Sequence, residues 1–437
     1  MTEAPAPDAY NRTALFWICV LALFTAAVAF SMRTAASDAI RQAVFDPIDP
    51  ANSGRMIGGA LGAAFSGFAF SLLVLSPFLD VIGAKRVLLL AACSFVGGSL
   101  LMVLAPSMGS GAGIGTLVTL GMALTGVGWG CTEASINPMT AALYPADKTH
   151  RLNVLHAWWP AGIVVGGLAS IGIGQIGLDW RWDIALIMVP GIAFGLWTLT
   201  QTFPPTESAA LGVGFGEMIA VPFKRPTFWI FFAIMFLTAS AELAPGSWVD
   251  VALTHTVGMK GILLLVYVSA IMFVMRHFAG VLSHRVSDMG LLWLCTIPAG
   301  LGLYLLSVAS SPVTALVAAT VWAIGVAFMW PTMIAAVSHR YPRGGPWTIG
   351  LVGFAGAMAI QLVLPRLGAI YDKAKLERAG GEAAFAALQP GPVLNDVLAY
   401  AATRSFQVVA LIPVVLFVIF GVVRILERKR RLGGGDD

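Results

Sequence analysis

The sequence predicts an all-α integral membrane protein with twelve transmembrane helices in two six-helix halves. Hydrophobic residues make up 58% of the 437 residues, charged residues only 11%, and the mean hydropathy is +0.84. Soluble domains carry about 25% charged residues, so a soluble globular enzyme is excluded. Apolar runs recur between short polar breaks, and most approach or exceed the length of about 20 residues that crosses a bilayer.

Each apolar run is predicted to form one membrane-spanning helix, in chain order. The predicted helices cover 13–40, 56–77, 86–106, 112–143, 151–175, 182–202, 226–250, 260–283, 289–309, 312–337, 347–369 and 398–425. Several runs exceed the length of a single crossing, so some helices should tilt or project beyond the hydrocarbon core. No small-residue cleavage site follows the first run, which we interpret as a retained helix rather than a signal peptide.

The distribution of basic residues predicts the orientation. Lysine and arginine are more frequent in the breaks on the side that holds both termini, and most of those on the opposite side gather around one long final loop. The positive-inside rule therefore places both termini in the cytoplasm. We expect a multi-pass monomer in a plasma membrane of the bacterial inner-membrane type.

Several classes of function have no signal in the sequence. The four cysteines lie in apolar runs and form no CxxC pair, so no disulfide framework or metal site is indicated. There is no HExxH, and the run 109–115 lacks the lysine and strand of a phosphate loop. We predict no catalytic residues, no cofactor, no nucleic-acid partner and no ATP-driven step. The expected partners are a small-molecule substrate, protons and the lipid bilayer.

The chain divides into two halves, and the polar breaks between their apolar runs are similar. We predict an N-terminal half over 1–202, a linker over 203–225 with an apolar segment on the inner membrane surface, and a C-terminal half with a basic tail over 226–437. An offset of 204 residues aligns Asp80 with His284, in the breaks after the second and eighth helices. Many secondary transporters consist of two such repeats with the substrate between them near the midplane.

Glu133 lies near the middle of the apolar run 114–143. A carboxylate there costs several kcal/mol unless it is protonated, paired or exposed to a water-filled cavity. Such residues typically carry protons, ions or polar solutes, and a structural carboxyl bonded to neighbouring helices is the alternative. The same offset of 204 maps Asp38 onto Glu242, and both lie in apolar surroundings. They are expected to face one cavity, or else to be hydrated near the outer ends of their helices.

The breaks and helices together resemble the major facilitator superfamily over the whole chain. The break 76–86 is similar to its cytoplasmic loop Gly-x-Leu-x-Asp-x-x-Gly-x-Arg/Lys, with Ser76 in place of the first glycine, and the second copy carries His284 in place of the acid. The resemblance implies the major facilitator fold. It also implies gating loops, whose residues here are Asp80, Lys85, Arg86, His284 and Arg285.

Four segments resemble the fucose permease branch of sugar–proton symporters. They are 133–138, 151–156 with Gly162, 276–280 and 367–372. This resemblance implies proton symport of a sugar or sugar-like solute by alternating access, with proton coupling through Asp38 and Glu133, to which the repeat adds Glu242. One departure is Trp159, at a position where the branch has a sugar-binding asparagine, so the particular sugar does not carry over.

Further residues are predicted to line a substrate site. They are Arg33, Asn137, His156, Trp159, Trp248, Arg276, Trp330 and Gln361. His156 is expected either in the cavity, as a hydrogen-bonding group or second proton site, or at the inner face. The aromatic residues are alternatively packing or interface anchors.

The two arginines leave other functions open. Arg33 and Arg276 are expected to pair with acids, or to bind a negatively charged substrate. The second possibility describes an organic-anion or drug carrier. A non-transporting membrane sensor on the same fold is a further alternative, without an appended signalling domain to support it.

Overall fold

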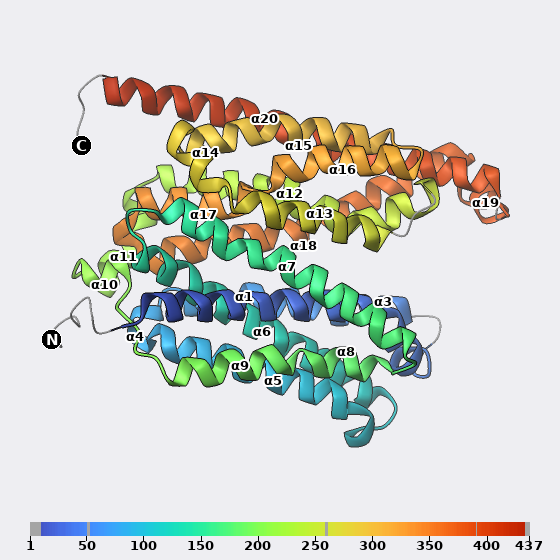
Figure 1. Ribbon diagram of the computed structural model, residues 1–437. Coiled ribbons are helices and arrows are strands. Elements are labelled where there is room, and N and C mark those ends of the chain that lie inside the picture. The colour runs from blue at the N-terminus through green and yellow to red at the C-terminus, as the bar shows by residue number, and fades with distance from the viewer. Residues whose placement is uncertain (1–9, 50–52, 258–260, 390, 433–437) are drawn as a thin grey trace. The chain divides into compact units, whose positions relative to one another are not determined.

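A computed structural model describes residues 10–49, 53–257, 261–389 and 391–432, without the side chains of 54–55, 246–257, 261–262, 364 and 428–432. Every regular element in these residues is a helix (Figure 1). Eleven of the helices there are long and apolar enough to cross a membrane. A twelfth span is added if α13 (Gly261–Arg276) and α14 (Ala279–Val286), bent by 58° at their junction, are taken together. The prediction of an all-helical, multi-span membrane protein is confirmed.

The chain forms two compact units. Unit 1 comprises Met1–Phe228 with Val337–Phe354, and unit 2 comprises Trp229–Ala336 with Ala355–Asp437. Three helices therefore contribute to both, because α12 (Thr227–Val257), α17 (Met329–Arg340) and α18 (Gly345–Ala379) each cross a unit boundary.

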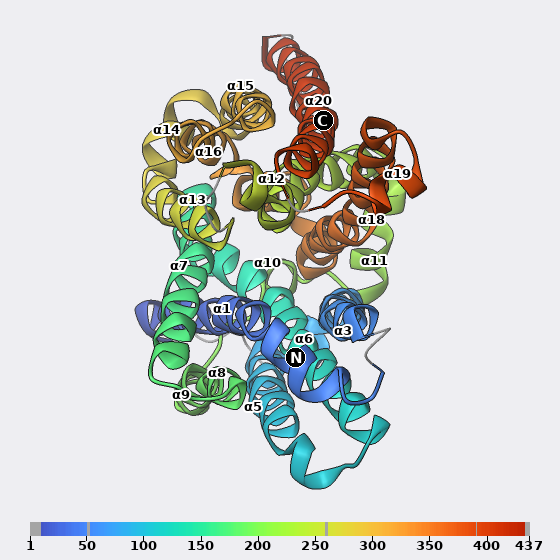
Figure 2. The same ribbon diagram turned by 90° about the vertical axis from the view of Figure 1, so that its right-hand side faces the viewer.

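Unit 1 is built around α6, which packs against helices on several sides. Its helices are α1 (Arg12–Ala35), α2 (Ser37–Ile40), the π-helix η1 (Arg41–Phe45), α3 (Ser53–Leu75), α4 (Leu79–Ile82), α5 (Ala84–Met108), α6 (Ala112–Leu143), α7 (Lys148–Gln175), α8 (Trp180–Leu186), α9 (Met188–Leu199), α10 (Glu207–Ala210), α11 (Phe215–Lys224) and the 3-10 turn η2 (Pro342–Gly344). Figure 2 shows α6 between α3 and α5, with α1 and α7 alongside each other.

Glycines allow the close packing of α6. A Cβ atom at Gly126 would lie 1.9 Å from the carbonyl oxygen of Ala64 on α3, and one at Gly130 would lie 2.0 Å from the Ser71 hydroxyl. Small residues one turn apart let two helix backbones approach each other in this way. A glycine on α7 does the same: a Cβ at Gly162 would lie 2.6 Å from that of Ala27 on α1. The rigid packing fixes the faces that α1, α3, α6 and α7 present to one another.

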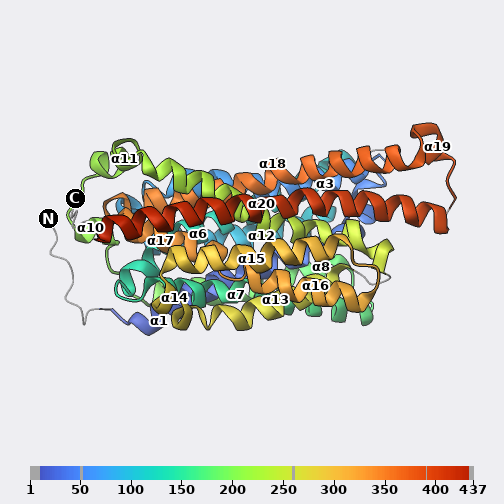
Figure 3. The same cartoon turned by 90° about the horizontal axis from the view of Figure 1, so that it is seen from above.

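Unit 2 contains the remaining helices. They are α12 (Thr227–Val257), α13, α14, α15 (Asp288–Ser307), α16 (Pro312–Val326), α17, α18, α19 (Glu382–Ala386) and α20 (Pro392–Leu432). Figure 3 shows α15 running beside α16 and α20. Three predicted spans are each divided in two. Helices α8 and α9 meet at Ile187, α13 and α14 are separated by His277 and Phe278, and α16 and α17 are separated by Ala327 and Phe328. The last of these divisions lies in the candidate site of unit 2.

Candidate functional site

Glu133 lies inside α6 and is only 5% exposed. The Nδ2 of Asn137, one turn further along the same helix, donates to Glu133 Oε2 at 2.6 Å and to its carbonyl oxygen at 3.1 Å. The carboxyl is therefore fixed by its own helix, because side chains four residues apart lie on one face.

Asn137 also bonds His156 on α7. The distance from His156 Nε2 to Asn137 Oδ1 is 2.8 Å, and both side chains are 3% exposed. An amide oxygen only accepts, so this arrangement requires the hydrogen on Nε2. The Asn137 amide thus connects Glu133 to His156 by two hydrogen bonds, and the two residues that it connects are both titratable. His156, for which the sequence left two positions open, is buried within α7.

Arg33 is buried in the same unit, on α1. Its Nη1 donates to Thr125 Oγ1 on α6 at 2.6 Å, and the side chain is 3% exposed. Thr125 in turn donates its hydroxyl hydrogen to the carbonyl of Met122 at 2.8 Å, so the oxygen is available to accept from the guanidinium. No ion pair of Arg33 occurs within the described residues.

Aromatic rings from four helices meet beside this contact. Phe68 on α3 stacks on Trp129 of α6 at 4.0 Å between ring centroids, and Trp129 stacks on Trp159 of α7 at 4.7 Å. Phe30 on α1 lies 5.8 Å from Trp159 and 6.4 Å from Trp129. Phe65 on α3 completes the group, called here the aromatic cluster: Phe30, Phe65, Phe68, Trp129 and Trp159. Trp159, which stands where the fucose permease branch has an asparagine, is thus part of this aromatic cluster.

Unit 2 buries Glu242 on α12 against Arg276 at the end of α13. Arg276 Nη2 lies 2.7 Å from Glu242 Oε1, and the side chains are 2% and 4% exposed. Arg276 Nε donates to the Ala327 carbonyl at 2.6 Å, and the backbone N–H of Trp330 donates to Glu242 Oε2 at 3.1 Å. One oxygen of the carboxylate therefore binds the arginine and the other binds backbone.

Pro331 explains why this pair lies at the division between α16 and α17. Proline has no N–H, so the carbonyl of Ala327, four residues before it, loses its helical partner. An unpaired backbone group inside a membrane is costly. Arg276 satisfies that carbonyl, and Glu242 accepts from the Trp330 N–H, so the ion pair also stabilises a broken helix.

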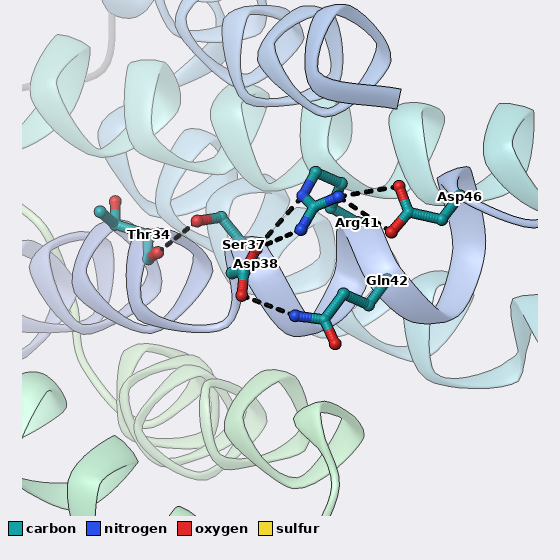
Figure 4. Close-up of polar contacts among 6 residues, drawn as sticks. All are labelled: Thr34, Ser37, Asp38, Arg41, Gln42 and Asp46. Atoms are coloured by element: carbon teal, nitrogen blue, oxygen red, sulfur yellow. Dashed lines mark hydrogen bonds and ion pairs between the residues drawn. The ribbon is translucent and has the colours of Figure 1, made fainter. Parts of the chain in front are cut away.

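Asp38 lies in a different environment from the other two acids. Helix α1 ends at Ala35, and the Asp38 side chain is 70% exposed in α2 (Figure 4). Arg41 Nη2 donates to its Oδ1 at 2.8 Å and Gln42 Nε2 to its Oδ2 at 2.7 Å, while Arg41 also pairs with Asp46. Hydrogen bonding from Arg41 lowers the pKa of Asp38 below the ordinary aspartate value.

Three further predicted site residues are Trp330, Gln361 and Trp248. Trp330 is buried, and a Cβ at Gly356 would lie 2.2 Å from its ring. Gln361 is half-buried in α18. Trp248 lies outside the residues whose side chains are described.

The predicted gating loop of unit 1 is tied to the linker. Asp80 accepts from the hydroxyls of Thr206 at 2.5 Å and Ser208 at 2.9 Å, and Lys85 Nζ donates to the carbonyls of Leu199 and Gln201 at 2.8 and 2.9 Å. Arg86 is exposed and bonds the carbonyl of Ile82.

The same end of unit 1 holds two further contacts. Lys148 at the start of α7 pairs with Glu207 of the linker at 2.7 Å. Ser76, where the loop pattern has glycine, lies against Gly350 of α18, since a Cβ there would be 2.0 Å from the serine hydroxyl. In the second copy of the loop, His284 and Arg285 are exposed.

Sequence reasoning did not single out Thr125, Trp129, Thr206 or Ser208. Trp129 and Thr125 had a possible signal, because they precede Glu133 by four and eight residues and so share its side of α6. The linker hydroxyls had none, since their partner Asp80 is more than a hundred residues away. No cluster of three His, Cys, Asp or Glu residues able to hold a metal occurs in the described part of the chain.

A bundle of membrane-spanning helices with acids and arginines buried inside them has the architecture of a solute transporter. The family model of the Major Facilitator Superfamily matches residues 13–363, and the chain belongs to this superfamily of transporters. A search of curated protein sequences finds no significant match.

Solved structures of transporters resemble the chain in fold. The E. coli fucose:proton symporter FucP has a TM-score of 0.70 and 16% identity, covering 94% of this chain and 98% of its own. The proton:xylose symporter XylE, solved with 6-bromo-6-deoxy-D-glucose, has a TM-score of 0.72 and 13% identity, covering 93% and 94%. The human organic anion transporter MFSD10 has a TM-score of 0.70 and 12% identity, covering 95% and 100%. Identities this low show the fold alone.

Proposed function

We propose that this transporter moves a small polar solute, a sugar or sugar-like compound, by proton symport with alternating access. The observation that carries the proposal is the buried chain from Glu133 through Asn137 to His156. A carboxyl inside a membrane is held more cheaply when it is protonated. Protonation of Glu133 therefore favours the occluded state that alternating access passes through.

The imidazole gives the proton a second position. Histidine is a residue type that commonly accepts and donates protons in proteins, and His156 lies within hydrogen-bond distance of the amide that also binds Glu133. Asn137 bonds both groups and keeps them in fixed orientation, whichever of them is charged. In this proposal Glu133 carries the coupled proton, and His156 adjusts the pH at which it is released.

The other two predicted proton sites receive different roles here. Asp38 is exposed and its pKa is lowered by Arg41, so it is a poor proton carrier near neutral pH. Glu242 forms an ion pair with Arg276 and accepts a hydrogen bond from the Trp330 N–H. Loss of the carboxylate charge would weaken both contacts, and with them the support of the backbone between α16 and α17. We assign Glu242 to the control of conformation and Glu133 to the proton.

The likeness in fold to FucP and XylE, which are named as sugar:proton symporters, supports the sugar part of the proposal. The aromatic cluster supports it too, because ligand sites combine ring surfaces with a few polar groups. The basic residues along the chain favour an orientation with both termini in the cytoplasm. The proposal places the protein in a plasma membrane of the bacterial inner-membrane type, as a monomer.

Proton flux tests the proposal. Purified protein in liposomes that hold a pH-sensitive dye receives neutral sugars and sugar acids from outside, with Glu133→Gln and Asp38→Asn beside the wild type. Solute-evoked acidification of the lumen that is lost in Glu133→Gln and kept in Asp38→Asn is the expected result. Acidification that persists at the wild-type rate in Glu133→Gln would contradict the assignment of the coupled proton to Glu133.

A further inference from the structure

Arg33 presents a buried positive charge, and the described residues hold no negative partner for it. A guanidinium carries five N–H donors. Among the described residues, the side chain of Arg33 makes one hydrogen bond, to Thr125. Residues of this kind are rarely retained inside membrane helices unless they pair with an acid or line a path for substrate. Arg276 follows the first pattern, since Glu242 neutralises it. Arg33 fits the second.

Trp129 provides a second incomplete group. Its indole nitrogen is buried and has no hydrogen-bond partner among the described residues. Buried indole N–H groups normally find a partner. Trp129 lies one turn from Thr125 on α6, and Phe30 lies one turn from Arg33 on α1. The two faces meet, because Arg33 bonds Thr125 while the rings of Phe30 and Trp129 are 6.4 Å apart.

The aromatic cluster supplies the surface beside these donors. Phe30, Phe65 and Trp159 keep part of their surface exposed although their rings contact one another. A ligand with an anionic group and a ring-shaped or carbon-rich body matches this arrangement. The guanidinium fork binds a carboxylate with two parallel hydrogen bonds, and the rings take the apolar face of the body.

We infer that Arg33, with Thr125, Trp129 and the aromatic cluster, forms a subsite for the carboxylate of a sugar acid. The inference rests on the proposed function and narrows its substrate class. Thr125 and Glu133 are eight residues apart on α6, which separates the carboxylate and the proton by about 12 Å along the helix. Substrate anion and coupled proton thus occupy different sites on one helix, and proton entry offsets the charge of the anion.

The test compares a charged solute with its neutral counterpart. Counterflow of labelled D-glucuronate in proteoliposomes is competed with unlabelled D-glucuronate, D-glucuronamide or D-glucose. Variants are Arg33→Gln, Arg33→Lys and Trp129→Phe, with Arg12→Gln as the control, an exposed arginine on the same helix. Thermal unfolding with and without D-glucuronate is recorded for each.

The expected result is that D-glucuronate competes about ten- to a hundredfold better than D-glucuronamide. Arg33→Gln abolishes this preference, Arg33→Lys retains part of it, and Arg12→Gln leaves it intact. D-glucuronate raises the unfolding temperature of the wild type and of Arg12→Gln, and does not raise that of Arg33→Gln. A folded Arg33→Gln that keeps the preference would overturn the inference.

The two proposals fail separately. Equal competition by D-glucose, D-glucuronamide and D-glucuronate, with Arg33→Gln unchanged, overturns the carboxylate subsite and leaves sugar symport standing. Competition by D-glucuronate without any proton flux supports the subsite and contradicts the proposed coupling. No exchange of any sugar or sugar acid by folded protein contradicts both.

Discussion

Each of the two units buries an arginine and a glutamate in its membrane helices and treats them differently. In unit 2, Arg276 and Glu242 bind each other and repair the backbone where Pro331 divides a span. In unit 1, Arg33 bonds a threonine and Glu133 bonds an amide that leads to a histidine. Charges that neutralise each other serve the fold in unit 2, whereas unit 1 places Arg33 against a neutral hydroxyl and links Glu133 to a titratable side chain.

Removing one partner of the ion pair in unit 2 should have the largest effect on stability. Arg276→Gln should lower the free energy of unfolding by about 3–5 kcal/mol, because it leaves Glu242 as an uncompensated buried charge. The double variant Arg276→Gln/Glu242→Gln should recover most of that loss. Chemical unfolding in detergent, with Arg12→Gln as control, measures both. A double variant no more stable than the single would show that the pair is not what holds this region.

The two gating loops allow a second comparison. Asp80→Ala should cost about 1–3 kcal/mol, because it leaves the buried hydroxyls of Thr206 and Ser208 without their acceptor. His284→Ala, at the matching exposed position, should change stability by about 0.5 kcal/mol or less. The same unfolding measurement checks both. Equal costs at the two positions would contradict the asymmetry of the loops.

Arg33→Met sharpens the contrast with Arg276. The variant loses one hydrogen bond but removes a buried charge, so stability without ligand should stay within about 1 kcal/mol of the wild type. A loss as large as that of Arg276→Gln would mean that Arg33 supports the fold instead of a ligand.

Asp38 should show the smallest effect. Its pKa is lowered in the folded state, so its pairing with Arg41 stabilises the protein above the ordinary aspartate pKa of about 3.9 and loses this effect as pH falls through the lower folded value. Between pH 5 and 8, therefore, the unfolding temperature of the wild type relative to Asp38→Asn should not vary with pH. If the difference in unfolding temperature changes between pH 5 and 8, Asp38 titrates in that range and its pKa is not lowered.

The membrane class, the order of the spans and the position of Glu133 could be predicted, because each depends on local composition and on helical spacing. The partnership of Glu133 with Asn137 follows from the same spacing. The contact of Arg33 with Thr125 could not be predicted, since it depends on which faces of α1 and α6 meet. That choice is made by close backbone packing at glycines such as Gly126, which no single helix reveals.

Asp38 illustrates a different limit. The residues within two positions of it are as apolar as those within two positions of Glu242, and the repeat offset aligns the two. Helix α1 nevertheless ends at Ala35, before Asp38, and nothing in the run of alanines marks that end. Composition therefore located a carboxylate near the end of a membrane helix, and left open whether it faces a cavity or water.

The central claim, that Glu133 carries the coupled proton, is tested most directly by separating exchange from accumulation. Wild type and Glu133→Gln are reconstituted, and labelled solute is followed first in counterflow without a pH gradient and then in uptake driven by one. The account predicts that Glu133→Gln retains counterflow and loses the gradient-driven accumulation. Accumulation by Glu133→Gln to the wild-type level would contradict it.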